Sequence, residues 1–151
     1  MYRFDMILTF EDLVESWGSP LQKASDKGYP KLYDDASYWV LYHNDLAVAY
    51  TSSYHISDNC VLVGNTYVRK EWRGNGIHSM LLNYRNNAPH MIKATKVTVV
   101  NPIESTKIEQ LEKTIKRLGY KKVQKSQDVS DVMSESIYTM LVEGEKQIWR
   151  L

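Results

Sequence analysis

Three consecutive β-forming runs in the first half of the chain constrain the fold more than any other feature of the sequence. Residues 37–43 read SYWVLYH, residues 46–56 read LAVAYTSSYHI and residues 60–68 read CVLVGNTYV. All three are rich in β-branched and aromatic residues, and the turns between them, ND and SDN, are short. Strands joined by such short turns pair with their neighbours in antiparallel fashion, so the sequence predicts a three-stranded meander.

The segment before the meander predicts elements that can cover it. Residues 2–9, YRFDMILT, are expected to form a strand that leads into a helix. Thr9 can cap that helix with Asp12 three residues later, and Gly18 can end it. The expected apolar stripe of the helix comprises Phe10, Leu13, Val14 and Trp17. Residues 20–36 are polar and aromatic, and they hold either a second short helix or a loop.

Helices and strands alternate after the meander. The patterns predict a helix at about residues 74–87, a strand at 96–100, a helix at about 104–118, and strands near 120–124 and 136–143. A strand, a crossover helix and another strand imply one parallel pair. The predicted fold class is therefore α+β, with a mixed, mainly antiparallel central sheet of six to seven strands, flanking helices and one βαβ unit.

Composition limits the classes of function that are open to the chain. With 151 residues, it is expected to form a single domain over residues 1–151. Its 19 Lys and Arg nearly balance its 18 Asp and Glu, which argues against a nucleic-acid partner. No apolar run reaches the length of a membrane helix, and the N-terminus lacks a signal-peptide pattern, so a cytoplasmic location is expected. The single cysteine, Cys60, is expected to be a small buried hydrophobe, and no metal site is predicted.

The turn between the third strand of the meander and the next helix contains the residues that best indicate a function. Arg73, Gly74, Asn75 and Gly76 open a helix whose expected core-facing residues are Ile77, Met80, Leu81 and Tyr84. The first amides of a helix have no partner within it and lie at the positive end of its dipole. Glycines let a ligand approach this backbone, so the turn suits a phosphate or pyrophosphate. A helix cap with two turn glycines is an equally good interpretation of these residues alone.

The wider stretch from residue 68 to residue 82, V-x-x-x-W-R-G-N-G-I-H-S-x-L-L, resembles the coenzyme A loop of the GNAT superfamily of N-acetyltransferases. Arg73 and Gly76 match the family pattern, while His78 replaces its usual small last residue. The order of elements is also similar to that family from about residue 38 to residue 142. The resemblance implies that the chain binds acetyl-CoA as its acyl donor.

The resemblance also assigns cofactor contacts. The pyrophosphate would lie on the backbone of residues 73–78, and the pantetheine arm would pair with the end of the preceding strand. The implied cofactor-binding residues are Tyr67, Val68, Arg73, Gly74, Asn75, Gly76, Ile77, His78 and Asn101. His78 either hydrogen-bonds a phosphate or faces solvent, and Asn101 is either a cofactor contact or a turn residue before Pro102.

The implied reaction is direct attack of an amine on the thioester, with the oxyanion stabilised by a strand amide near Tyr67. The strand at 60–68 carries no carboxylate, which leaves Asp58, or water ordered by Asn65, Thr66 and Tyr67, to accept the amine proton. Many family members protonate the leaving thiolate with a tyrosine four residues before a Gly-Phe or Gly-Tyr pair. Here Ile115 stands four residues before the Gly119-Tyr120 pair, and Leu111 lies one turn earlier on the same face. Both belong to a predicted continuous core stripe with Ile108 and Leu118. The remaining catalytic candidates are Tyr67, Ser105 and Tyr138.

The sequence therefore predicts an acyl-CoA-dependent N-acyltransferase whose partners are a coenzyme A thioester and an amine acceptor, which is a metabolite, a peptide or a protein. The alternative is a catalytically weakened member of the same fold that serves as a coenzyme A binding or protein-interaction module. Tyrosines in the meander either line an acceptor pocket or cover the sheet, and basic residues between 113 and 125 form either a phosphate contact or a solvated face. A homodimer formed through residues 136–149 is left open.

Overall fold

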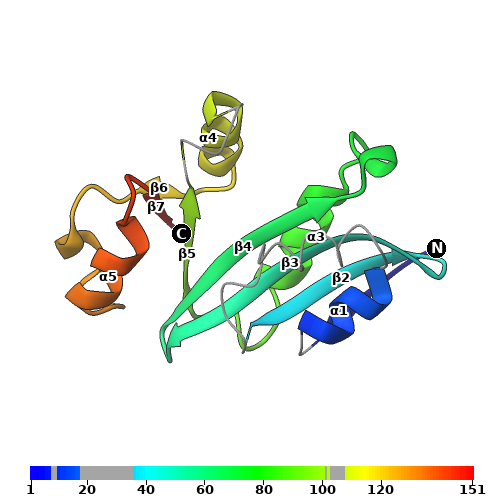
Figure 1. Cartoon of the computed structure of the whole chain (residues 1–151), viewed down its shortest axis with the longest axis horizontal. Helices are drawn as coiled ribbons and strands as arrows, with labels where there is room; N and C mark the ends of the chain where they lie inside the picture. The colour runs from blue at the N-terminus through cyan, green and yellow to red at the C-terminus, as the bar shows by residue number, and fades with distance from the viewer. Residues whose placement is uncertain (8–9, 18–35, 101, 103–107) are drawn as a thin grey trace. The chain divides into compact units, whose positions relative to one another are not determined.

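The computed structural model of the protein describes residues 1–7, 10–17, 36–100, 102 and 108–151. Its contacts divide the chain into two compact units, which are residues 1–54 with 64–92 and residues 55–63 with 93–151. Strands β3 and β4 pass through both units, and each unit is described by itself below. Figure 1 labels the elements along the chain.

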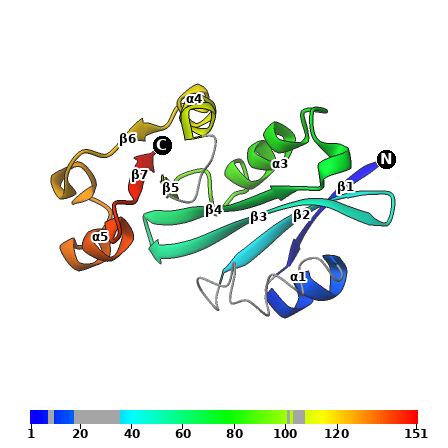
Figure 2. The ribbon, with the colours of Figure 1, turned by 45° about the horizontal axis from the view of Figure 1, so that its top comes forward.

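The first unit is built on a four-stranded antiparallel arrangement. It contains β1 (Tyr2–Ile7), α1 (Phe10–Trp17), β2 (Ser37–His43), most of β3 (Leu46–Ser57), the end of β4 (Cys60–Val68), the 3-10 turn η1 (Lys70–Trp72) and α3 (Ile77–Asn86). Phe4 lies opposite Leu41, and Trp39 lies opposite Thr51. A bulge between Leu41 and Tyr42 interrupts the register of β2 with β3. Helices α1 and α3 cover opposite faces of these strands (Figure 2).

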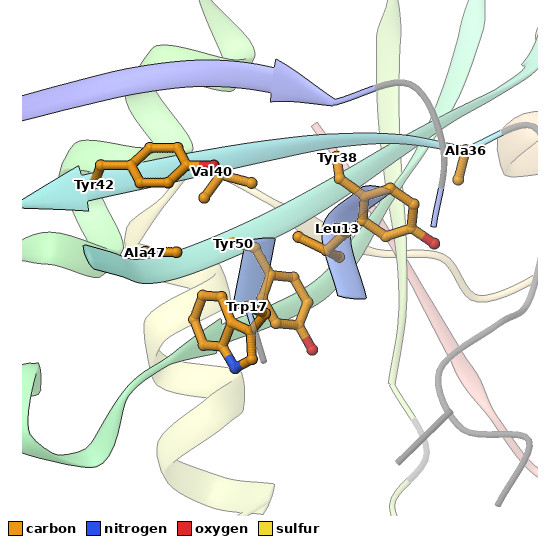
Figure 3. Packing of buried hydrophobic residues seen from close by; sticks show 8 residues of the cluster. All are labelled: Leu13, Trp17, Ala36, Tyr38, Val40, Tyr42, Ala47 and Tyr50. Atoms are coloured by element: carbon orange, nitrogen blue, oxygen red, sulfur yellow. The ribbon is translucent and has the colours of Figure 1, made fainter. Parts of the chain in front are cut away.

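Aromatic residues dominate the core on the α1 face. Leu13 and Trp17 of α1 pack against side chains of β2 and β3, as Figure 3 shows. This cluster contains Leu13, Trp17, Ala36, Tyr38, Val40, Tyr42, Ala47 and Tyr50. The alternation of strand side chains explains it, since every second residue of β2 points to this face. The expected helix stripe is confirmed at Leu13 and Trp17, which are buried.

The second unit joins the parallel pair to the end of the chain. Its elements are the start of β4, β5 (Thr95–Val100), α4 (Ile108–Arg117), β6 (Lys121–Lys122), η2 (Ser126–Val129), α5 (Glu135–Val142) and β7 (Gln147–Arg150). Strands β4 and β5 are parallel, with Cys60 opposite Thr95, while β7 pairs antiparallel with both β5 and β6. Cys60 and Val97 share a buried cluster with Leu141 and Ile148.

The predicted fold class is confirmed. In the described part of the chain, seven strands follow the hydrogen-bonded order β1-β2-β3-β4-β5-β7-β6. Most neighbours are antiparallel, and β4, α3 and β5 form the expected βαβ unit. No helix among the described residues is long and apolar enough to cross a membrane.

The prediction of a strand at residues 136–143 is wrong, because this segment forms α5. Ser134 caps the helix by accepting a hydrogen bond from the amide of Ile137 at 3.3 Å. Ile137 and Leu141, four residues apart, pack into the same cluster of the second unit. The last strand is β7 instead, and it has hydrogen-bonded neighbours on both sides.

Other boundaries also differ from the prediction. The predicted strand at 120–124 shortens to the two residues of β6, and α3 begins at Ile77 rather than near Gly74. Gly74 and Gly76 have φ angles of 84° and 74°, which a right-handed helix does not contain. The predictions for Thr9, for the end of α1 at Gly18, for residues 20–35 of the segment 20–36 and for the start of a helix at 104 fall outside the described residues.

Candidate functional site

The turn between β4 and α3 exposes a row of backbone donors. The first hydrogen bond of α3 runs from the amide of Met80 to the carbonyl of Gly76 at 3.1 Å. Among the described residues, the amides of residues 74–79 therefore have no hydrogen-bond acceptor. Residues 73–76 are all exposed, so the turn is open to a ligand. Such a row of free donors at a helix N-terminus attracts an anion.

The two glycines of this turn are needed for its backbone conformation. Gly76 is the N-cap of α3 in the left-handed conformation, and no side chain caps the helix. A Cβ atom added at Gly74 or Gly76 would have no heavy atom within 4 Å. Crowding therefore does not select glycine here, whereas the positive φ angles do. The open space above both residues leaves room for a group that binds the amides.

Arg73 folds back onto the end of β4. Its backbone amide donates to the carbonyl of Lys70 at 3.3 Å, and its Nε donates to the carbonyl of Val68 at 2.9 Å. Its guanidinium lies 5.4 Å from the centre of the Tyr67 ring. The amide of Arg73 is thus occupied, so the row of free donors begins at Gly74.

Arg69, which directly follows β4, connects the end of that strand to β3 and α1. Its Nε donates to the carbonyl of Ala47 at 2.6 Å, and its Nη2 donates to the carbonyl of Trp17 at 2.8 Å. The guanidinium also lies over the Trp17 ring, 4.3 Å from its centre. Because Trp17 is the last residue of α1, this contact fixes the end of that helix beside β3 and β4.

Tyr67 is the exposed member of an aromatic group on the α1 face. Its ring centre lies 5.8 Å from that of Trp17 and 6.0 Å from that of Tyr50. Trp17 and Tyr50 are almost fully buried and meet edge to face at 5.0 Å, whereas Tyr67 is 41% exposed. We call Trp17, Tyr50, Tyr67, Arg69 and Arg73 the β4-end cluster. It combines two cations with an accessible aromatic surface.

A buried arginine lies on the opposite face of the same strands. Arg85 of α3 is 2% exposed, and its Nη1 donates to Thr51 Oγ1 at 2.7 Å. Thr51 Oγ1 in turn lies 2.8 Å from Thr66 Oγ1 of β4. The predicted stripe of α3 is confirmed at Ile77 and Leu81, but Arg85 is buried while Tyr84 is 41% exposed. Ile77, Leu81 and Arg85 are spaced four residues apart and so lie on one face of the helix. This spacing is the feature of the sequence that indicates the burial of Arg85.

His78 lies half-buried in the first turn of α3, so it does not simply face solvent. Burial lowers the pKa of His78 below its usual value, and the positive charge of Arg85 lowers it further. The neutral imidazole is therefore favoured near neutral pH. In that form it offers one N–H donor rather than a positive charge to a ligand on the turn.

The structure brings some of the predicted site residues together. Tyr67, Val68 and residues 73–78 all lie in the first unit, between the end of β4 and the first turn of α3, and all of them except the buried Ile77 are at least partly exposed. Asp58 lies in the turn at the start of β4, whereas Tyr67 is near its end. Asn101 and Ser105 fall outside the described residues.

The proton-donor candidates of the second unit have different surroundings. Tyr138 belongs to α5 rather than to a strand, and it packs half-buried against the cluster that contains Cys60. Ile115, which stands where many family members have a tyrosine, is buried in α4. Leu111 is 38% exposed, so the predicted continuous core stripe of α4 is wrong at that residue. Neither aliphatic side chain can donate a proton.

Solved structures of similar fold include proteins described as acetyltransferases and acyl-CoA N-acyltransferases. A putative N-acetyltransferase from Lactobacillus plantarum aligns with a TM-score of 0.64 at 14% identity, covering 99% of this chain and 95% of that chain. A GNAT family acetyltransferase from Elizabethkingia anophelis, solved with acetyl-CoA bound, aligns with a TM-score of 0.59 at 12% identity, covering 99% and 97%. At such identities the similarity establishes the fold.

A third similar structure carries a ligand that joins both substrates. Naa50 from Arabidopsis thaliana, in complex with the bisubstrate analogue CoA-Ac-MVNAL, aligns with a TM-score of 0.59 at 18% identity, covering 99% of this chain and 97% of that chain. A sequence search of curated proteins finds no match. The model of the acetyltransferase (GNAT) family, however, matches residues 6–85, which include β4, the glycine turn and most of α3. The chain therefore belongs to the GNAT family of acetyltransferases.

Proposed function

We propose that this protein is an N-acyltransferase that moves the acetyl group of acetyl-CoA to a primary amine by direct attack. The observation that carries the proposal is the row of free amides at residues 74–79, which opens to an uncrowded surface at the positive end of α3. Pyrophosphate is the part of coenzyme A that such a row of donors binds. Similar structures hold acetyl-CoA and a CoA–peptide analogue, which supports the same use of the fold here.

The residues present fit a coenzyme A thioester. Amides from Gly74 to His78 would bind the pyrophosphate, and the side chain of His78 would add a neutral donor. The backbone of Tyr67 and Val68, at the end of β4, would pair with the pantetheine arm as an added strand does. Asn101 remains a proposed contact of the cofactor from outside the described residues.

The chemical step needs a neutral amine, a stabilised oxyanion and a proton for the departing thiolate. A strand amide at the end of β4 would stabilise the oxyanion. Tyr67 lies at the end of β4, beside the proposed pantetheine path, and is 41% exposed, so it is the proton donor that we favour over Ser105 and Tyr138. Tyr67→Phe is the direct check of that role, with a lower kcat and an unchanged affinity for acetyl-CoA as the expected result.

A second candidate function has one specific observation in its favour. Ile115, buried in α4, stands where many family members have their proton-donating tyrosine. A member of the family that binds coenzyme A without chemistry, as a binding or interaction module, would need no proton donor. The two candidates differ in turnover, since both require the glycine turn to bind the cofactor.

Titration calorimetry with acetyl-CoA and with coenzyme A, beside a thiol-release assay with a panel of amines, tests the proposal. Gly76→Glu is expected to weaken binding at least tenfold, because it places a carboxylate where the phosphates would lie. Gly144→Glu is the matched control, since Gly144 has a similar φ of 78° and equally open surroundings but lies after α5. Equal affinity in the wild type and in a folded Gly76→Glu variant would remove the phosphate-binding role of the turn. Binding without turnover of any amine would favour the non-catalytic module.

A further inference from the structure

We propose that β1 pairs with the β1 strand of a second copy of this chain, so that two molecules associate through antiparallel strands around a two-fold axis at Phe4. The inference concerns a surface outside the proposed cofactor turn and does not depend on the proposed function. It is carried by the outer edge of β1 and by the order of charges along that strand.

Strand β1 is the longer of the two outer strands of the sheet. In the described part of the chain, the order β1-β2-β3-β4-β5-β7-β6 ends with β1, which has six residues, and with β6, which has two. The segment 136–149, considered above as a dimer contact, holds α5 and most of β7, and β7 already has a neighbour on each side. An outer strand of regular geometry offers its main-chain donors and acceptors to a further strand.

The outward main-chain groups of β1 belong to every second residue. Residues of an antiparallel strand alternate between directing both main-chain groups at the partner strand and directing both away from it. The carbonyl of Met1 accepts from the amide of Asn44 at 2.9 Å, so Met1 and the residues at spacings of two from it face β2. The amide of Met6 agrees with this alternation, since it donates to Asp5 Oδ1 at 2.9 Å. The outward-facing residues are Tyr2, Phe4 and Met6.

The charges on β1 make the strand complementary to itself. Arg3 and Asp5 lie on one face, on either side of Phe4, and their side chains are 56% and 53% exposed. When two copies pair in antiparallel fashion around Phe4, Arg3 of each copy lies opposite Asp5 of the other. The pair that Arg3 and Asp5 form within one chain, at 3.7 Å, then gains an opposite charge from the second copy on both sides.

Other arrangements of the same two strands bring like charges together. An axis at Arg3 places the two Arg3 side chains opposite each other, and an axis at Asp5 does the same for the two carboxylates. Parallel pairing in register also sets each charge beside its own counterpart. An axis between two residues opposes outward with inward main-chain groups, so it forms no ladder. Charge and main-chain direction together favour the register centred on Phe4.

The other face of β1 is apolar and partly exposed. Tyr2 is 40% exposed and Met6 is 41% exposed. Phe4, between them, stacks on Tyr84 of α3 with ring centres 4.1 Å apart, and Tyr84 is itself 41% exposed. In the register centred on Phe4, Tyr2 of each copy lies opposite Met6 of the other, and the two Phe4 residues face each other at the axis. Pairing therefore removes apolar surface from water on this face while it matches charges on the other.

The same charges protect β1 from unrelated strands. Charged side chains on an outer strand oppose pairing, because a charge that loses water without gaining a partner is costly. The carboxylate of Asp5 also accepts from the amide of Met6, so an incoming strand must replace that contact. A second copy brings Arg3 to this carboxylate, whereas a strand without a cation at that place leaves it unmatched. The partner that fits this edge is therefore another molecule of this chain.

Sedimentation velocity of the full chain, from micromolar to millimolar concentration, tests the inference. We expect reversible association to a dimer. Arg3→Glu and Asp5→Arg should each weaken it by about tenfold or more, because like charges would then face each other across the axis. Lys122→Glu is the matched control, since it reverses an exposed charge on the other outer strand, β6, and it should associate like the wild type.

Exchange of the two charges is the stricter test. The double variant Arg3→Glu/Asp5→Arg restores opposite charges at both places, so it should recover the association of the wild type. An equal mixture of the two single variants should also form dimers, each with one molecule of either kind. Circular dichroism and the urea midpoint of each variant verify that it is folded.

A proline variant tests the main-chain contact independently of charge. Met6→Pro removes an outward donor and leaves the inward hydrogen bonds to β2 in place, because proline is tolerated on an outer strand when its nitrogen faces away from the sheet. We expect it to abolish the association. Unchanged association in a folded Met6→Pro variant would contradict pairing through this edge.

Three further results would overturn the inference. The first is a wild type that stays monomeric at millimolar concentration. The second is association that persists unchanged in both single charge variants, which would place the contact elsewhere on the molecule. The third is a folded double variant that associates no better than the single variants, which would contradict the register centred on Phe4.

Discussion

At the scale of single residues, the backbone matters more than the side chains in the proposed cofactor turn. Gly74 and Gly76 take conformations that other residues adopt only with strain, and these conformations free the amides that follow. The sequence predicted a turn at these two glycines, because they separate the strand pattern that ends at Val68 from the helical apolar pattern that begins at Ile77. It did not predict that the Arg73 side chain folds back onto the end of β4. That conformation depends on contacts with Tyr67 and Val68, which only the folded strand places beside Arg73.

Arg85 shows why residue burial is harder to predict than residue spacing. A charged residue on an amphipathic helix is normally assigned to the solvent face, yet Arg85 is buried and donates to Thr51 of β3. The hydrogen bonds that Arg85 donates to Thr51 and to Asn86 offset the cost of burying its guanidinium. No local pattern contains that information.

The lowered pKa of His78 predicts a pH dependence of stability. Because the folded-state pKa lies below the unfolded value of about 6.5, the unfolded state binds more protons once the pH falls below 6.5. The contribution of His78 is therefore complete above pH 6.5, and it is lost as the pH falls from 6.5 through the folded-state pKa. We expect His78→Gln to lose less stability than the wild type between pH 7 and pH 5.5, as measured by urea unfolding. An unchanged dependence on pH in a folded His78→Gln variant would contradict this role of His78.

At the scale of elements, strands were predicted more reliably than the segments near the chain end. The runs that became β2, β3 and β4 combine alternation with unambiguous turns, so their limits were nearly correct. Residues 136–143 have β-branched and aromatic residues in a short apolar run, which is also compatible with a buried helix. The N-cap that Ser134 provides favours the helix. The position of Ser134 three residues before Ile137 is a sequence signal for a helix start that the prediction did not use.

The chain leaves the end of α4 through Gly119, and replacing this glycine is expected to destabilise the protein measurably. The amide of Tyr120 donates to the carbonyl of Ile115, and that of Gly119 donates to the carbonyl of Lys116, which together form a Schellman motif. Gly119 has a φ of 97°, and a Cβ atom there would lie 3.1 Å from Leu151 Cδ1. We expect Gly119→Ala to lower the free energy of unfolding by about 1–2 kcal/mol, measured by urea denaturation.

Gly144→Ala separates the two causes of that loss. Gly144 has a φ of 78° but open surroundings, so its replacement by alanine incurs the backbone strain without the steric contact. It should be less destabilising than Gly119→Ala. Equal losses in the two variants would show that the contact with Leu151 contributes nothing, and no loss in either would contradict the assignment of strain.

At the scale of the whole molecule, the two compact units share strands. Residues 46–54 of β3 belong to the first unit and residues 55–57 to the second, and β4 is divided in the same way at Val63 and Gly64. A strand cannot lose half of its ladder without weakening the rest, because its backbone donors and acceptors would be left unpaired. We therefore propose that residues 1–151 fold as a single cooperative domain.

That proposal predicts coincident unfolding by probes of the two units. Three of the four tryptophans, at positions 17, 39 and 72, lie in the first unit, so fluorescence mainly reports on it. Cys60 reports on the second unit, since it is fully buried and desolvation raises the pKa of its thiol to about 11. In a urea titration, the reactivity of this thiol toward a disulfide reagent at pH 8 should appear at the same midpoint as the change in fluorescence. Two separate midpoints would mean that the units unfold independently.

The use of main-chain amides in the turn after β4 has a consequence for how this protein and its relatives diverge. In the proposed mode of binding, a phosphate held by peptide N–H groups would impose almost no demand on the identity of the side chain at Asn75, provided that the glycines keep the conformation of the turn. Substitutions can then accumulate around an unchanged anion site. Comparisons of backbone geometry should therefore detect distant members of this family after sequence comparisons have lost them.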